Sequence, residues 1–153
     1  EKIEVVIHPQ SVVHSMVEFV DGSVKAQLGM PDMRVPIQYA LSYPERLEAD
    51  FPRVDFVSLG HLDFEEPDFE RFPALTLAYE AAKTGGTSPA VLNAANEVAV
   101  RAFLDRRIPF GRIAQIIEGT LAEHQPHRPR DLQDLLEVDR WARERAEQLV
   151  TSA

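Results

Sequence analysis

Residues 13–28 read Val13-His14-Ser15-Met16-Val17-Glu18-Phe19-Val20-Asp21-Gly22-Ser23-Val24-Lys25-Ala26-Gln27-Leu28. Two runs rich in β-branched and apolar residues, 13–20 and 23–28, flank the dipeptide Asp21-Gly22. Asp-Gly between two such runs is a strong hairpin signal, because a type I′ turn needs positive φ at both of its central residues. The stretch therefore predicts two antiparallel strands that turn at Asp21-Gly22.

The segments on either side of the hairpin extend this pattern. Glu4–His8 is apolar and β-branched, which predicts a further strand that Pro9 interrupts. After the hairpin, Gly29–Met33 leaves the sheet as a loop. Pro36–Leu41 follows as a short predicted helix with proline in its first turn. Residues 1–42 are thus expected to form a β-rich head.

Residues 69–153 carry apolar side chains at helical spacing and predict four helices, which short connections would make antiparallel neighbours in a bundle. Gly85-Gly86 predicts the end of the first helix, Ser88-Pro89 caps and opens the second, Pro109 precedes the third, and Asp139 caps the fourth. The apolar positions expected to face the core are Phe72, Leu75, Tyr79, Ala82, Leu92, Ala95, Ala99, Ala102, Phe103, Ile113, Ile116, Ile117, Leu121, Trp141 and Leu149.

Residues 43–68 lie between these parts and differ from both in composition. They hold eight acidic and two basic residues, and they fall within the proline-rich span from Pro31 to Pro73. Spaced prolines favour extended connections, so this stretch predicts an acidic linker. Its acidic run 63–68 alternates with aromatic residues and proline, which favours a solvated linker over a calcium loop. The fold class is therefore α+β, with a head that is the remnant of an α/β domain, a linker and a helical bundle.

Composition excludes several classes of protein. The 153 residues include no cysteine, which excludes disulfides, thiolate metal sites and a cysteine nucleophile, and suits the cytoplasm. A net charge of −9 argues against a nucleic-acid partner, and no apolar run is long enough to span a membrane. The sequence has no glycine-rich phosphate loop and no nucleophile elbow. Because it opens on Glu1 and enters an apolar run at once, we expect it to be part of a longer protein.

The polar segment His8–Ser15 is the first candidate site, and three interpretations stay open. His8 and His14 could bind a metal, although their spacing matches no recognised ligand pattern. Ser11 and His14 could line a substrate pocket, with His14 a donor near an anionic substrate. Alternatively, the segment is a turn whose side chains satisfy backbone groups.

Two further groups of residues could bind a ligand. In Gly29–Arg34, two methionines and a proline offer an apolar platform for a flat ring, and Arg34 could meet a phosphate; loop packing is the plainer explanation. Asn93, Asn96 and Glu97 share one helix face and favour a structural network over a ligand site. In that network Glu97 is placed to pair with Arg101.

Four of these segments, in order and at matching spacing, resemble the C-terminal part of the 1-deoxy-D-xylulose 5-phosphate reductoisomerase family. The resemblance runs from about Glu4 through the last helix. The segments are Ile7-His8-Pro9-Gln10-Ser11-Val12-Val13-His14-Ser15-Met16-Val17, Asp21-Gly22-Ser23-Val24, Pro31-Asp32-Met33-Arg34 and Leu92-Asn93-Ala94-Ala95-Asn96-Glu97.

The resemblance implies an enzyme of non-mevalonate isoprenoid biosynthesis that uses NADPH and a divalent metal (Mn, Mg or Co). In that family 1-deoxy-D-xylulose 5-phosphate is rearranged to an aldehyde and reduced by hydride to 2-C-methyl-D-erythritol 4-phosphate. By the same resemblance, Ser11 and His14 line the substrate pocket, and Pro31 and Met33 pack near the nicotinamide ring. The hairpin strands correspond to those that form the family's homodimer, and Asn93, Asn96 and Glu97 hold structure.

The family's NADPH-binding domain, acidic metal ligands, phosphate-binding Asn-Lys pair and mobile lid match nothing in this sequence. We therefore expect residues 1–42 to end a catalytic domain, 43–68 to be the linker, and 69–153 to be the C-terminal helical domain. On this expectation the chain alone is inactive and binds no cofactor or metal. The competing interpretation, a self-standing interaction or dimerisation module, needs a head with more than two strands to be stable in water.

Overall fold

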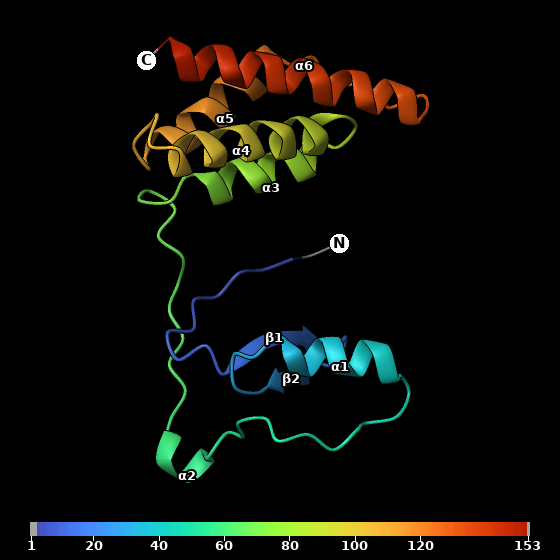
Figure 1. Ribbon diagram of the computed structural model, residues 1–153, viewed down its shortest axis with the longest axis vertical. Coiled ribbons are helices and arrows are strands. Elements are labelled where there is room, and N and C mark those ends of the chain that lie inside the picture. Colours follow the sequence, from blue (N-terminus) through green and yellow to red (C-terminus); the bar gives the residue numbers. More distant parts are fainter. Residues whose placement is uncertain (1–2, 153) are drawn as a thin grey trace. The chain divides into compact units, whose positions relative to one another are not determined.

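The computed structural model describes residues 3–152, and the chain divides into two units between Pro67 and Asp68 (Figure 1). The first unit contains a two-stranded antiparallel sheet and two helices, and the second contains four helices. This mixed content agrees with the predicted α+β class. The elements are β1 (Val13–Glu18), β2 (Val24–Leu28), α1 (Arg34–Ser42), α2 (Phe56–Leu59), α3 (Ala74–Thr84), α4 (Ser88–Leu104), α5 (Arg112–Glu123) and α6 (Leu132–Thr151).

The hairpin of β1 and β2 confirms the prediction, but the expected type I′ turn is wrong. The Gly22 N–H donates to the Phe19 carbonyl at 2.9 Å, and the Phe19 N–H donates to the Ser23 carbonyl at 2.9 Å. Among the turn residues, Gly22 alone has a positive φ, of 81°. The connection is therefore a three-residue loop in which glycine takes the left-handed position. Asp21 contributes its carboxylate, which accepts the Ser23 N–H at 2.9 Å.

The strand predicted over Glu4–His8 is wrong. The structure has only an isolated bridge there, in which Ile7 and Glu65 exchange two backbone hydrogen bonds of 2.9 Å. A strand needs a partner along its length, and residues 3–67 as described supply none for this segment. The predicted helix over Pro36–Leu41 is confirmed as α1, with Pro36 in its first turn.

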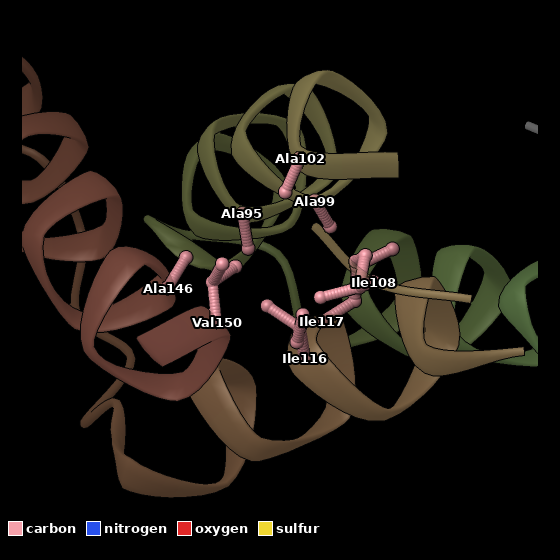
Figure 2. Packing of buried hydrophobic residues seen from close by; sticks show 8 residues of the cluster. All are labelled: Ala95, Ala99, Ala102, Ile108, Ile116, Ile117, Ala146 and Val150. Atoms are coloured by element: carbon pink, nitrogen blue, oxygen red, sulfur yellow. The ribbon is translucent and has the colours of Figure 1, made fainter. Parts of the chain in front are cut away.

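The second unit is built around α4, which contacts α3, α5 and α6. Small residues on α4 (Ala95, Ala99 and Ala102) face isoleucines of α5 in one buried cluster. Figure 2 shows these side chains converging with Ile108, Ile116, Ile117, Ala146 and Val150. Alanine allows neighbouring helices to approach closely, and the isoleucines fill the remaining space. The helical spacing correctly predicted the core side of α4 and α5. It was wrong at α3, where Ala82 and the preceding Phe72 are exposed, and displaced by one position at α6, whose buried apolar residues are Ala142, Ala146 and Val150.

Two predicted helix caps are wrong. Asp131 caps α6, because its carboxylate accepts the Asp134 N–H at 2.9 Å, whereas Asp139 lies inside the helix and pairs with Arg143. At α4, Ser88 is the first helical residue and Thr87 is the N-cap, with no side-chain cap bond. Both Asp131 and Asp139 precede apolar helical positions, so local spacing could not distinguish them. No helix in residues 3–152 is long and apolar enough to span a membrane.

Candidate functional site

A pocket of about 730 Å³ lies within the first unit. Its wall comes from the end of the hairpin, the loop before α1, the first turn of α1 and the chain that enters α2. The lining residues are Ser11, His14, Val35, Pro36, Phe56 and those at 27–33 and 52–54. The pocket thus joins segments that lie about 40 positions apart in the sequence.

The four residues that the family resemblance places against ligands, Ser11, His14, Pro31 and Met33, all line this pocket. Ser11 has a φ of 53°, a left-handed conformation that non-glycine residues rarely adopt. Its N–H donates to the His8 carbonyl at 3.0 Å, which closes a tight turn immediately before β1. Residues in such conformations persist only where the surrounding structure holds them, and they cluster at functional sites.

His14 owes its position to an irregularity in the hairpin. Val13 pairs with Leu28 and Ser15 pairs with Gln27, so His14 has no partner of its own across the ladder. An extra residue of this kind forms a bulge, which re-aims a side chain relative to the regular pleat. A Cβ on Gly29 would lie 3.7 Å from His14 Nε2, so the imidazole lies close against the glycine backbone.

The rest of the lining is mainly apolar. Pro31 and Met33 share the pocket with Val35, Pro36, Val54 and Phe56, and the Met33 side chain is 71% exposed. An exposed, flexible thioether next to proline and aromatic carbon can pack against a flat ring. The polar groups Ser11, His14 and Gln27 also line it, so the pocket offers both an apolar surface and hydrogen-bonding groups.

The prediction that Arg34 meets a phosphate is not supported by its contacts. Its guanidinium donates to both carboxylate oxygens of Asp32, at 2.5–3.0 Å, and lies 4.9 Å from the centre of the Phe51 ring. These hydrogen bonds lower the pKa of Asp32 below its ordinary value. The Arg34 guanidinium thus binds a carboxylate of its own loop, and Arg34 does not line the pocket.

A different cation, Arg53, lines the pocket and forms no ion pair with any residue in the described range 3–152. Sequence reasoning missed it, together with Gln27 and Phe56. Arg53 lies in the stretch interpreted as linker, and nothing in its local sequence indicates that the chain returns to the hairpin. The one local signal of regular structure near Arg53 was Asp55, a residue type favoured at the start of helices. Its carboxylate caps α2 by accepting the Val57 N–H at 3.0 Å.

The structure separates the two histidines that a metal site would have used. His14 lines the pocket, whereas His8 Nδ1 bonds the Asp63 carbonyl at 2.7 Å and its ring stacks on Phe64. Across residues 3–152, no three His, Asp or Glu side chains come together in a way that could hold a metal ion.

Comparison with protein families matches residues 28–145 to the DXP reductoisomerase C-terminal domain. The chain belongs to the 1-deoxy-D-xylulose 5-phosphate reductoisomerase family. It is 59% identical over 150 residues to the reductoisomerase of Pelodictyon phaeoclathratiforme and 60% identical over 146 residues to that of Chlorobium chlorochromatii. These matches cover 98% and 95% of this chain but only 39% and 38% of the relatives.

Solved reductoisomerase structures share the fold. The enzyme of Zymomonas mobilis in complex with NADPH matches with a TM-score of 0.86 at 53% identity, over 97% of this chain and 39% of that one. A DOX-P reductoisomerase in complex with NADPH, fosmidomycin and magnesium matches with a TM-score of 0.84 at 41% identity, over 95% and 38%. The chain therefore spans about two-fifths of the length of the reductoisomerases that it resembles.

In this reductoisomerase segment, two of the three polar residues on α4 form a structural network. Asn93 donates to Glu97 at 3.2 Å, and Glu97 accepts from Arg143 of α6 at 2.7 Å. The prediction that Glu97 pairs with Arg101 is wrong, because Arg101 pairs with Asp105. Glu97 instead faces α6, where Arg143 also binds Asp139, so the network joins two helices.

Proposed function

We propose that this chain supplies one wall of the active site of a 1-deoxy-D-xylulose 5-phosphate reductoisomerase. That enzyme forms 2-C-methyl-D-erythritol 4-phosphate, using NADPH, in non-mevalonate isoprenoid biosynthesis. The observation that supports this role is the convergence of Ser11, His14, Pro31 and Met33 on one pocket of about 730 Å³. The identity of 59% with a named reductoisomerase supports the same activity for the parent protein.

Within this proposal, the apolar and polar parts of the pocket have different roles. Pro31 and Met33 pack against the nicotinamide ring, which fits their exposed apolar surface. Ser11 and His14 hold polar groups of the sugar phosphate, His14 as a binding group and not as the main carrier of protons. NADPH supplies the hydride when it is bound, and the residues of this chain orient its ring and exclude water from it.

The divalent metal (Mg, Mn or Co) is proposed to bind to other parts of the parent enzyme. A related solved structure is described as a complex with magnesium, and fosmidomycin accompanies magnesium in another. In the range 3–152 the acidic side chains do not converge on a metal-sized site. The chain on its own is therefore predicted to have no reductoisomerase activity.

The hairpin is proposed to pair with a second subunit, which would make the parent enzyme a homodimer. Met16, Val17 and Phe19 are 43–57% exposed, and each strand of a two-stranded sheet has a free edge. A cytoplasmic location and the absence of nucleic-acid and membrane partners complete the proposal. The comparisons favour it over a self-standing interaction module, because the relatives they found are named as enzymes.

The proposal is tested by producing the full-length parent protein and following NADPH oxidation. We expect consumption of NADPH only when 1-deoxy-D-xylulose 5-phosphate and a divalent metal are both present, and none with residues 1–153 alone. A parent protein that binds NADPH and metal yet leaves this substrate unchanged would refute the assignment.

A further inference from the structure

The turn that carries Ser11 is tied to a distant part of the chain. Residues 7–10 lie against residues 63–65, through the bridge of Ile7 with Glu65 and through side-chain contacts of His8, Gln10, Asp63 and Phe64. We call His8, Gln10, Asp63 and Phe64 the clasp. It lies outside the lining of the pocket, and all of it belongs to the first unit.

Gln10 and Asp63 form the centre of the clasp through two hydrogen bonds that run in opposite directions. Gln10 Nε2 donates to Asp63 Oδ2 at 2.5 Å, and the backbone N–H of Asp63 donates to Gln10 Oε1 at 3.1 Å. Both ends of the amide are therefore used by one residue. Only a side chain with a donor and an acceptor fits this arrangement opposite a carboxylate.

His8 adds a third connection. The Asp63 carbonyl can only accept, so His8 Nδ1 carries the hydrogen in their 2.7 Å bond. The imidazole stacks on Phe64 with ring centres 4.9 Å apart and planes 25° from parallel. Asp63 is thus held through its backbone N–H, its carbonyl and its carboxylate, which also lies 3.1 Å from His61 Nε2.

The clasp immediately precedes the strained residue of the pocket wall. Ser11 follows Gln10 directly, has a φ of 53°, and donates its N–H to the carbonyl of His8. Val12 comes next and is 5% exposed, the most deeply buried apolar side chain of the described residues 3–67. An unfavourable backbone conformation persists only where its neighbours hold it. The clasp supplies that restraint on the side of His8 and Gln10.

We infer that Gln10 and Asp63 are positioning residues, which hold the backbone of Ser11 so that Ser11 and His14 face the ligand. The expected change in KM rests on the proposed function, whereas the restraint on the turn is inferred from the geometry alone. Neither residue contacts the pocket, so each acts through Ser11.

Exchanging the amide of residue 10 and the carboxylate of residue 63 tests the inference in the full-length enzyme. Gln10→Glu places two carboxylates against each other and breaks the clasp. Asp63→Asn alone is milder, since the new amide can turn its oxygen toward Gln10. In Q10E/D63N the carboxylate at position 10 can accept both the backbone N–H and the side-chain N–H of residue 63. Asp21→Asn, in the hairpin turn of the same unit, is the matched control.

We expect Q10E to raise the KM for the sugar phosphate roughly three- to tenfold with kcat changed less than about twofold, because a binding wall is displaced. Backbone amide exchange across Ser11–His14 should become faster in Q10E, with the unfolding temperature close to that of D21N. The double variant should restore both KM and exchange. If Q10E does not fold, Gln10→Ala removes both hydrogen bonds of the Gln10 side chain without adding a charge, and its comparison with D21N tests the broken clasp.

The inference is overturned if Q10E and D21N have the same KM and exchange, or if the double variant restores neither. Faster exchange that the double variant restores, in a parent protein without reductoisomerase activity, would uphold the clasp and refute the proposed function. Normal reductoisomerase activity in a parent protein whose clasp variants alter neither KM nor amide exchange would uphold the proposed function and refute the clasp.

Discussion

The hydroxyl oxygen of Thr87 lies 2.7 Å from Nε2 of His124 and also accepts the backbone N–H of His127 at 3.2 Å. Thr87 is fully buried at the start of α4, and the two histidines belong to the connection between α5 and α6. The hydroxyl therefore forms one hydrogen bond with each of the two histidines. One threonine thus links two segments of the bundle.

Thr87→Val keeps the shape of this side chain but removes both hydrogen bonds. Because the freed groups are partly buried, we expect the bundle to lose about 1–3 kcal/mol of unfolding free energy. Urea unfolding measures it. Thr151→Val is the matched control: its hydroxyl bonds only carbonyls of its own helix at an exposed position, so a change within about 0.5 kcal/mol is expected. Equal losses in both variants would contradict the role of Thr87.

The stability of the bundle should fall as the pH drops below about 6.5. Burial, with the nearby charge of His127 as a smaller cause, lowers the pKa of His124 in the folded protein. The unfolded chain then binds a proton near pH 6.5 that the folded chain binds only at lower pH, so acid favours unfolding. The lowered pKa of Asp134 acts below about pH 3.8, outside this window.

Unfolding midpoints measured between pH 7 and pH 5 check this dependence. His124→Gln keeps a hydrogen-bonding group opposite Thr87 but cannot titrate, so its midpoint should vary less with pH than that of the wild type. Thr151→Val, which removes no titratable group, should keep the wild-type dependence. An unchanged slope in His124→Gln would show that another group titrates.

The ion pair of Glu97 with Arg143 should couple α4 to α6. The pair lowers the pKa of Glu97, chiefly through the hydrogen bond from Arg143. Both side chains are more than a third exposed, so a double-mutant cycle with Gln at each position should give a coupling of only about 0.2–1 kcal/mol. The same cycle on Glu97 and Arg101 should give none, and a larger coupling there would contradict the structure.

Met33→Ala in the full-length enzyme should weaken the use of NADPH. Loss of a thioether packed against a ring costs about 0.3–1.5 kcal/mol, which corresponds to a KM for NADPH raised roughly two- to tenfold. The metal concentration needed for activity should not change. Leu41→Ala, which shortens an exposed side chain on α1 outside the pocket, is the control. An unaltered NADPH response would remove Met33 from the site.

The first unit should be poorly ordered when the 153-residue chain is studied as a dilute monomer. Val12, at 5% exposed, is the one buried apolar residue in the described residues 3–67, and two strands alone are marginal in water. Amides of Val5–Leu28 should therefore exchange quickly while those of α4 and α6 exchange slowly. Uniformly slow exchange across Val5–Leu28 would contradict this expectation.

The sequence predicted those elements whose cause is local. Runs rich in β-branched and apolar residues with a glycine at the turn specify the hairpin, and apolar residues at helical spacing specify the core faces of α4 and α5. Errors arose where two residues were equally suitable by local sequence as a helix cap or as an ion-pair partner. Asp131 and Asp139 both precede apolar helical positions, and Glu97 has Arg101 on its own helix but binds Arg143 on another.

By itself, then, the sequence determined the hairpin, α1 and the four helices of the second unit. Through residue type, spacing and family resemblance it also identified Ser11, His14, Pro31 and Met33 as candidates. Only the tertiary structure showed that these four share one pocket with Arg53 and Phe56, and that Gln10 is held by Asp63. The physical reason is the range of the interactions. Turn and helix preferences act over a few residues, whereas these contacts join segments about 40–50 residues apart and depend on how the whole unit folds.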